Sequence, residues 1–85
     1  MELFKKLKRY KGFKTIRYTY DCNLTIIALE HKFSTIIELA SYVHSLKDHV
    51  EIKILNSNND RTIYKGSVSY FIDNTPSEIN KEIYV

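Results

Sequence analysis

The residues best suited to chemistry are one cysteine and three histidines, but their spacing does not bring them together. His44 and His49 are five residues apart and diverge on a helix, and no Cys-x-x-Cys or His-Glu-x-x-His spacing accompanies them. Cys22 and His31 could form a nucleophile and base across a hairpin, yet no orienting third residue and no oxyanion-hole motif go with them. We therefore expect a protein that is not an enzyme, with no metal site and no cofactor.

Two other patterns could suggest a ligand-binding loop, but each lacks the motif that such a loop requires. The segment 56–60, Asn-Ser-Asn-Asn-Asp, is rich in oxygen atoms but lacks the Asp-x-Asp-x-Asp-Gly register and the distal Glu of a calcium loop. Its residues tolerate positive φ, so it predicts a hairpin turn. Gly12 and Gly66 are isolated and form no phosphate-binding loop.

Charge is the most informative feature of the chain. The first seventeen residues hold seven Lys or Arg against Glu2 alone, a local charge of +6. The remaining residues hold six basic and nine acidic side chains, or −3, which together gives the +3 of the whole chain. Such a field attracts a polyanion or an acidic protein face to one end of the molecule.

Aromatic side chains are interleaved with these cations, which is typical of a binding surface. Cations would contact phosphates while rings stack on bases, or the same cations would meet an acidic protein face. Two alternatives are a solvated amphipathic helix whose aromatic side chains belong to the core, and a helix on an anionic membrane surface, for which it is short and lacks Trp. The predicted partner-binding residues are Lys5, Lys6, Lys8, Arg9, Tyr10, Lys11, Lys14, Arg17, Tyr18 and Tyr20.

Length and cysteine content bound the class of protein. A chain of 85 residues makes one domain, 1–85, and buries only about 60–65% of its unfolded surface, so its stability is marginal. A single cysteine fits a reducing cytoplasm. The basic N-terminus is followed by no apolar signal-peptide region, and the apolar run 24–29 is too short for a membrane span. We expect a cytoplasmic protein with no integral membrane span.

In the first half of the chain, the apolar spacing changes from helical to alternating. Leu3, Phe4, Leu7 and Tyr10 form the stripe of a short basic helix within an arm over 1–12, before Gly12. Residues 13–20 alternate as a strand, with Lys14, Ile16, Tyr18 and Tyr20 on one face and Phe13, Thr15, Arg17 and Thr19 on the other. A turn at 21–23 leads to 24–30, a returning strand for which a helix is the open alternative.

The second half begins with the clearest helix, 34–46. Thr35 and Glu38 match a capping box, and the apolar stripe is Ile36, Leu39, Ala40, Val43 and Leu46, with Lys47 and His49 near the end. Residues 50–55 and 61–65 predict a second hairpin. The segment 67–73 is either a helical turn or a strand extension. Thr75, Pro76 and Glu78 suit the start of a short helix, and 82–85 predicts a terminal strand. The order predicts an α+β domain with a largely antiparallel sheet and one main helix on one face.

The C-terminal third resembles a known group of proteins. Ile63-Tyr64-Lys65-Gly66-Ser67-Val68-Ser69-Tyr70-Phe71-Ile72-Asp73, then Pro76 and Glu82-Ile83-Tyr84-Val85, is similar to small accessory proteins of phages and mobile elements of low-GC Gram-positive bacteria. The resemblance implies a source among mobile elements, whose products often modulate host or defence machinery by binding. It assigns no role to any residue.

These observations predict a non-catalytic binding protein of a phage or mobile element that modulates a host or defence protein with an acidic face, for example as an inhibitor of a CRISPR effector. The alternative is a nucleic-acid-binding accessory protein that uses the basic N-terminal arm.

Overall fold

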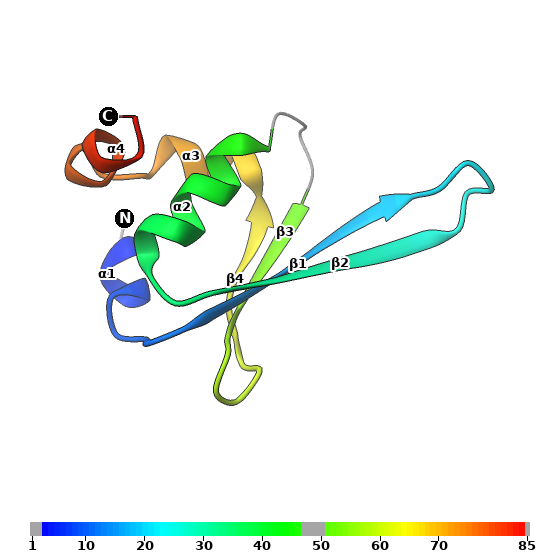
Figure 1. The fold of residues 1–85 in the computed structure, drawn as a ribbon, viewed down its shortest axis with the longest axis horizontal. Coiled ribbons are helices and arrows are strands. Elements are labelled where there is room, and N and C mark those ends of the chain that lie inside the picture. The colour runs from blue at the N-terminus through cyan, green and yellow to red at the C-terminus, as the bar shows by residue number, and fades with distance from the viewer. Residues whose placement is uncertain (1–2, 47–50, 85) are drawn as a thin grey trace.

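The computed structural model describes residues 3–46 and 51–84, which form an antiparallel sheet of four strands and four helices. The α+β class, the main helix and the short N-terminal helix are as predicted. In chain order the elements are α1 (Leu3–Leu7), β1 (Phe13–Tyr20), β2 (Ile26–Phe33), α2 (Ile36–Ser45), β3 (Glu51–Asn56), β4 (Thr62–Ser67), α3 (Val68–Asp73) and α4 (Ser77–Ile83). The helices gather at one end, and the β1–β2 hairpin extends away from them (Figure 1).

The sheet has the order β2-β1-β3-β4, so β1 is paired on both sides. Both predicted hairpins are present, and β1 has its predicted bounds. The open question at residues 24–30 is answered as a strand, which begins at Ile26 and continues to Phe33. Pairing of β1 with β3 ends at Arg17 and Ile52, whereas pairing with β2 continues to Tyr20 and Ile26.

The two faces of β1 divide as the alternation predicts. Phe13 and Thr15 are buried, and Thr15 lies opposite the buried Ile54 of β3. Tyr18 and Tyr20, on the other face, are exposed. A strand with one buried and one open face belongs to a sheet covered on one side only.

Helix α2 supplies the layer that covers the sheet. The Thr35 hydroxyl accepts a hydrogen bond from the Glu38 backbone N–H (3.2 Å) and lies 3.1 Å from the Glu38 carboxylate, which confirms the predicted cap. Glu38 is exposed, and Ile36 is half-buried at the margin of the core. The rest of the predicted stripe is buried, namely Leu39, Ala40, Val43 and Leu46. The predictions for Lys47, His49 and Val50 lie outside the described residues.

The basic N-terminal helix is part of the folded body. Leu3, Phe4 and Leu7 are buried, and the Phe4 ring lies 5.0 Å from that of Phe71 in α3. Helix α1 ends at Leu7, five residues earlier than the predicted arm. Three buried apolar side chains in a five-residue helix fix its orientation, so its cations point outward as a set.

The C-terminal region differs from the prediction. The predicted strand over 82–85 is wrong up to Tyr84, because Ser77–Ile83 is helical and Tyr84 follows as its C-cap; Val85 lies outside the described residues. Burial explains the helix, since Ile79 is buried and Ile83, four residues on, packs against the same core. The segment 67–73, left open between helix and strand, is helix α3 capped by the Ser67 hydroxyl.

The predicted cap at Thr75 is also wrong. Pro76, rather than Thr75, is the N-cap of α4, and it makes no side-chain capping bond. The Thr75 hydroxyl instead donates to the Phe71 carbonyl (2.9 Å), which ties the end of α3 to the start of α4.

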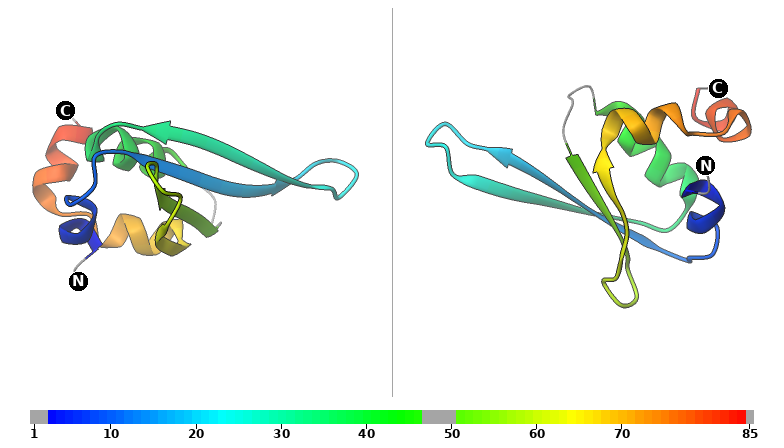
Figure 2. Two further views of the ribbon diagram at one scale, coloured as in Figure 1. Left: turned by 90° about the horizontal axis from the view of Figure 1, so that it is seen from below. Right: turned by 180° about the vertical axis from the view of Figure 1, so that it is seen from behind.

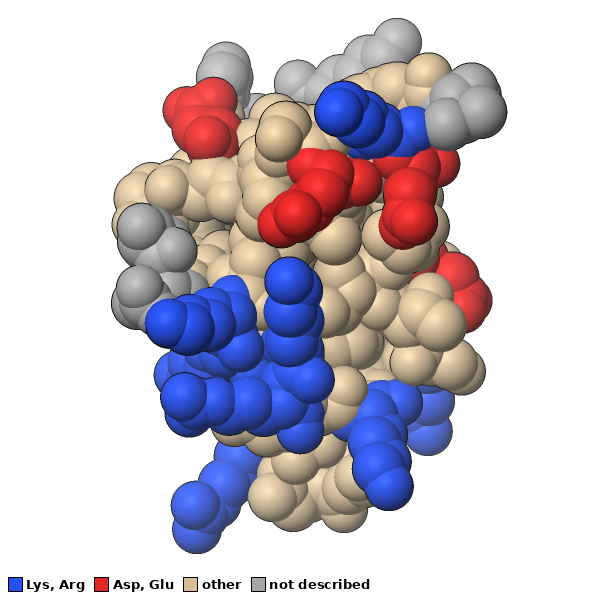
Figure 3. Space-filling model, turned by 90° about the vertical axis from the view of Figure 1, so that its left-hand side faces the viewer, with Lys and Arg blue, Asp and Glu red and all other residues tan. Residues whose placement is uncertain are grey.

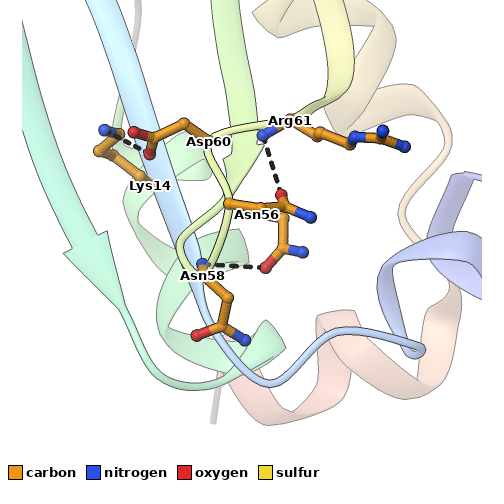
Figure 4. A network of polar contacts seen from close by, with 6 residues as sticks. Lys14, Asn56, Asn58, Asp60 and Arg61 are labelled. Atoms are coloured by element: carbon orange, nitrogen blue, oxygen red, sulfur yellow. Dashed lines mark hydrogen bonds and ion pairs between the residues drawn. The ribbon is translucent and has the colours of Figure 1, made fainter.

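The β3–β4 turn is as predicted, and it contacts Lys14 of β1, one of the predicted binding residues. Asp60, at φ 58°, donates its backbone N–H to the Asn56 carbonyl (2.8 Å). The Asn56 side chain accepts from the Asn58 N–H (3.2 Å), and the Asp60 carboxylate meets the Lys14 amine at 2.7 Å (Figure 4). The ion pair anchors the turn against β1.

Candidate interaction surfaces

The structure separates the predicted binding residues into two groups at opposite ends of the molecule. β1 rises by about 3.3 Å per residue, so its eight residues carry Tyr18 and Tyr20 away from α1. The α1 end and the hairpin tip accordingly lie at the two extremes of the longest axis (Figure 1). The contiguous run of basic and aromatic residues in the sequence is therefore not one continuous surface.

The first group forms a basic end. Lys5, Lys6, Lys8, Arg9 and Lys11 are all exposed, on α1 and the segment that follows it. Figure 3 views this end of the molecule and shows Lys and Arg side chains gathered together, with Asp and Glu side chains above them. Lys6 also donates to the Ile63 carbonyl of β4 (3.2 Å). We call the surface of Lys5, Lys6, Lys8, Arg9 and Lys11 the basic end.

Two predicted residues have structural roles between these ends. Tyr10 is half-buried and packs against the core, so its ring is not free to stack on a base. The Lys14 amine is paired with Asp60, and this hydrogen bond raises the pKa of Lys14 and lowers the pKa of Asp60. Both side chains stabilise the fold around β1.

The second group lies on what we call the distal ribbon, residues 18–28. No described strand pairs with this part of the hairpin other than its own partner strand. Tyr20 is 69% exposed, Ile26 opposite it is 60% exposed, and Tyr18 on the same face is 52% exposed. Ile27, on the other face, is 38% exposed. Apolar side chains are thus exposed on both faces of a two-stranded extension.

The turn of the distal ribbon places another apolar side chain at its tip. The Leu24 N–H donates to the Asp21 carbonyl (3.0 Å), and the Asp21 N–H donates to the Thr25 carbonyl (3.0 Å). The Asp21 carboxylate accepts from the N–H groups of Asn23 and Thr25, both at 2.9 Å. This is a three-residue hairpin loop whose last residue must be left-handed, a position that favours Gly or Asn.

Leu24 occupies that left-handed position, with φ of 62°, and is 80% exposed. The left-handed conformation costs a residue with a Cβ about 1–2 kcal/mol. An exposed leucine gains little from burial to offset that cost. Leu24 is therefore unfavourable for the isolated fold in two respects, and such positions cluster where proteins bind.

Arg17 lies at the base of the distal ribbon, on the face opposite to Tyr18. It pairs across the strands with Leu29 and Ile52. Its Nε atom is buried and makes no hydrogen bond to any residue in 3–46 or 51–84. An unsatisfied buried donor is unusual in a folded protein, and this one lies at the base of the distal ribbon.

The cysteine and histidines are not assembled into a site. Cys22 is exposed in the turn, whereas His31 lies toward the other end of β2, with its ring 4.8 Å from Tyr42 of α2. Among residues 3–46 and 51–84, no three His, Cys, Asp or Glu side chains are grouped so that they could hold a metal ion. His49 lies outside those ranges.

His44 instead joins α2 to the C-terminal segment. Its Nε2 lies 2.9 Å from the Thr75 hydroxyl, and its Nδ1 lies 2.7 Å from the Tyr84 hydroxyl. Because the Thr75 hydroxyl donates to Phe71, it must accept from Nε2–H, so Tyr84 donates to Nδ1 of a neutral ring. Burial also lowers the pKa of His44 below 6.5, which favours that neutral form.

Sequence reasoning missed four exposed apolar residues of the hairpin, namely Leu24, Ile26, Ile27 and Leu29. In the sequence they form only a short apolar run within a predicted returning strand. The signal was present, because a strand with one covered face alternates, whereas 26–29 is apolar throughout. An edge strand with that composition has no second layer to bury it.

Comparison of the chain with protein-family models, with curated proteins and with solved structures finds no match. Among the described residues, no helix has the length and apolar character needed to cross a bilayer.

Proposed function

We propose that this chain is a non-catalytic protein-binding module that contacts its target through the distal ribbon. The single observation that carries the proposal is the exposure of Tyr18, Tyr20, Leu24 and Ile26 on an extension that leaves the body of the protein. Exposed lysines are the ordinary state of a protein surface, whereas a cluster of large exposed apolar side chains marks an interaction site.

The marginal stability of the hairpin supports the same proposal. A two-stranded hairpin without a third strand or a helix is marginal in water. Its residues can only gain stability from a partner that removes their apolar surface from water. Tyrosine and leucine anchors of this kind contribute a large share of the binding energy at protein interfaces.

The resemblance of the C-terminal third to accessory proteins of mobile elements supports a class of target. On that basis the target is a host or defence protein of a low-GC Gram-positive bacterium, such as a CRISPR effector, and the module acts in the cytoplasm. An acidic face on the target would be attracted by the net positive charge of the module.

The test is capture from a nuclease-treated lysate of such a bacterium, followed by reconstitution with the purified target. The double variant Tyr20→Ser/Leu24→Ser should weaken the reconstituted complex by at least about tenfold, because two exposed anchors are lost. The matched control replaces Lys5, Lys6, Lys8 and Arg9 with Ser and should leave most of the affinity intact. Equal affinity of the wild type and the double variant would refute the proposal.

The basic end supports a second candidate, nucleic-acid binding. Its five cations are exposed, and Figure 3 shows Lys and Arg side chains gathered at this end of the molecule. Each phosphate contact releases counterions on duplex DNA with a salt slope of about −0.9. Replacing Lys5, Lys6, Lys8 and Arg9 with Ser should then flatten the slope by about two to four units and weaken all sequences alike. A wild-type affinity weaker than about 10 μM at physiological salt would refute this candidate.

A further inference from the structure

Strand β2 is an edge of the sheet along its whole length. The strand order places it outermost (Figure 2), and its residues from Ile26 to Lys32 are all exposed. An edge strand presents unpaired backbone N–H and C=O groups, which can template pairing with another strand. The other side of β2 is fully paired with β1, from Phe33 to Ile26.

The hairpin turn shows which backbone groups face the open edge. The Asp21 N–H bonds to the Thr25 carbonyl, so these two residues begin the hydrogen-bonded pairs of the hairpin. Bonded and non-bonded pairs alternate in an antiparallel ladder, so 19/27, 17/29 and 15/31 are bonded pairs. The residues of β2 whose N–H and C=O groups point away from β1 are therefore Ile26, Ala28, Glu30 and Lys32.

β2 carries few of the features by which proteins protect such an edge. It contains no proline, and its register with β1 has no shift that would mark a bulge. Charged side chains occur only in its second half, at Glu30 and Lys32. The first half, Ile26–Leu29, is apolar on both faces.

Neither charge of β2 forms a close ion pair with a described residue, although Glu30 interacts electrostatically with Lys14 and Lys32 with Asp60. Lys32 lies directly opposite Lys14, whose amine is already paired with Asp60. Glu30 lies opposite Ile16. Like charges opposite each other in a sheet are unfavourable, and a second carboxylate beside Lys32 would offset this pair further than Asp60 alone does.

We propose that a second copy of this chain occupies the edge, with the two β2 strands antiparallel about a two-fold axis at His31. In this register Glu30 of each copy lies opposite Lys32 of the other, and Leu29 lies opposite Phe33. Glu30 and Lys32 both turn their backbone groups outward, so they can form the bonded pairs of the new ladder. The new ladder spans residues 29–33 of each copy, where the strand ends, and it joins the two four-stranded sheets into one.

Charge selects this register among those that the backbone allows. Only even-numbered residues turn their backbone groups outward, so an even-numbered residue of one copy must lie opposite an even-numbered residue of the other. One strand can therefore slide along the other only by two residues at a time. One step places Glu30 opposite Glu30, the reverse step places Lys32 opposite Lys32, and two steps toward the hairpin tip place Glu30 opposite Ala28. Only the register centred on His31 brings opposite charges together, and it does so twice.

The experiment is a charge exchange followed by sedimentation equilibrium on the full chain, from about 1 μM to about 300 μM. The wild type should be a dimer in the upper part of this range. Glu30→Lys and Lys32→Glu should each weaken dimerisation by about ten- to a hundredfold, since each converts two attractive pairs into two repulsive ones. The matched control, Glu82→Lys on α4, should leave the dimer unchanged.

Mixing the two single variants gives the sharpest result. A Glu30→Lys chain presents two cations to the two anions of a Lys32→Glu chain, so the mixture should form a heterodimer although each variant alone is a monomer. The double variant Glu30→Lys/Lys32→Glu should dimerise as the wild type does. A wild type that stays monomeric at the highest concentration, or a mixture with no heterodimer, would overturn the proposal, whatever the target of the distal ribbon is.

Discussion

Leu24 offers a substitution that should improve stability and impair binding. Replacement by glycine removes the Cβ that makes φ of 62° unfavourable, while the turn keeps its hydrogen bonds to Asp21. Because Leu24 is 80% exposed, little apolar burial is lost. The variant Leu24→Gly should therefore be more stable than the wild type.

The magnitude follows from two opposing effects. Relief of the left-handed conformation contributes about 1–2 kcal/mol. Glycine also gains freedom in the unfolded chain, which costs about 0.4–1 kcal/mol. The difference is a stabilisation of about 0.5–1 kcal/mol, or roughly 3–6 °C in melting temperature for a domain of this size.

The assay is thermal unfolding followed by circular dichroism at one fixed protein concentration, because self-association makes the melting temperature depend on concentration. Leu24→Ala is the matched control. Alanine keeps the Cβ, so its stability should stay close to that of the wild type, while both variants lose the exposed leucine and should bind the target about tenfold more weakly. A melting temperature of Leu24→Gly equal to or below that of Leu24→Ala would refute the conformational argument.

The remaining predictions concern the core, the histidine and the cysteine. Val43→Asp should unfold the domain, seen as loss of cooperative melting, because a buried unpaired charge exceeds the spare stability of a small protein; a cooperatively folded variant would contradict the packing of α2. The folded-state pKa of His44 lies below its unfolded value of 6.5. The stability that the neutral His44 ring contributes is therefore complete above pH 6.5 and is lost as pH falls through the lower folded pKa. Urea unfolding at pH 7.5 and pH 5 should show this loss in the wild type and a smaller one in His44→Gln. Cys22→Ala should leave the melting temperature unchanged and the affinity for the target within about threefold of wild type, since the thiol is exposed in the turn. A complete loss of target binding in a folded variant would refute the binding-module proposal.

The elements that could be predicted are those whose local pattern agrees with their burial. In β1, Phe13 and Thr15 alternate with Lys14 and Ile16, and the sheet has one covered face, so the pattern fixed both type and bounds. The cap at Thr35 marked the start of α2 in the same way. At the C-terminus, Ile83 and Tyr84 favour a strand by propensity, but packing of α4 against the core determined the outcome.

The candidate surfaces could be predicted only in part, because residues that are near in the sequence need not be near in space. Lys8 and Tyr18 are ten residues apart in the chain, yet an extended strand carries the second far from the first. Tyr10 and Lys14 look like binding residues until Tyr10 meets the core and Lys14 meets Asp60. Those contacts come from distant parts of the chain and leave no local signal.

The contacts of α1 indicate when this helix docks during folding. The β1–β2 hairpin joins residues as few as six apart, whereas α1 is held by Phe71 of α3 and by the Ile63 carbonyl, 57 residues beyond Lys6. Loop closure over that separation comes late, after the hairpin has formed. Truncation of Phe4 should therefore accelerate unfolding and leave the refolding rate nearly unchanged, so the lifetime of the native state depends on the helix that docks last.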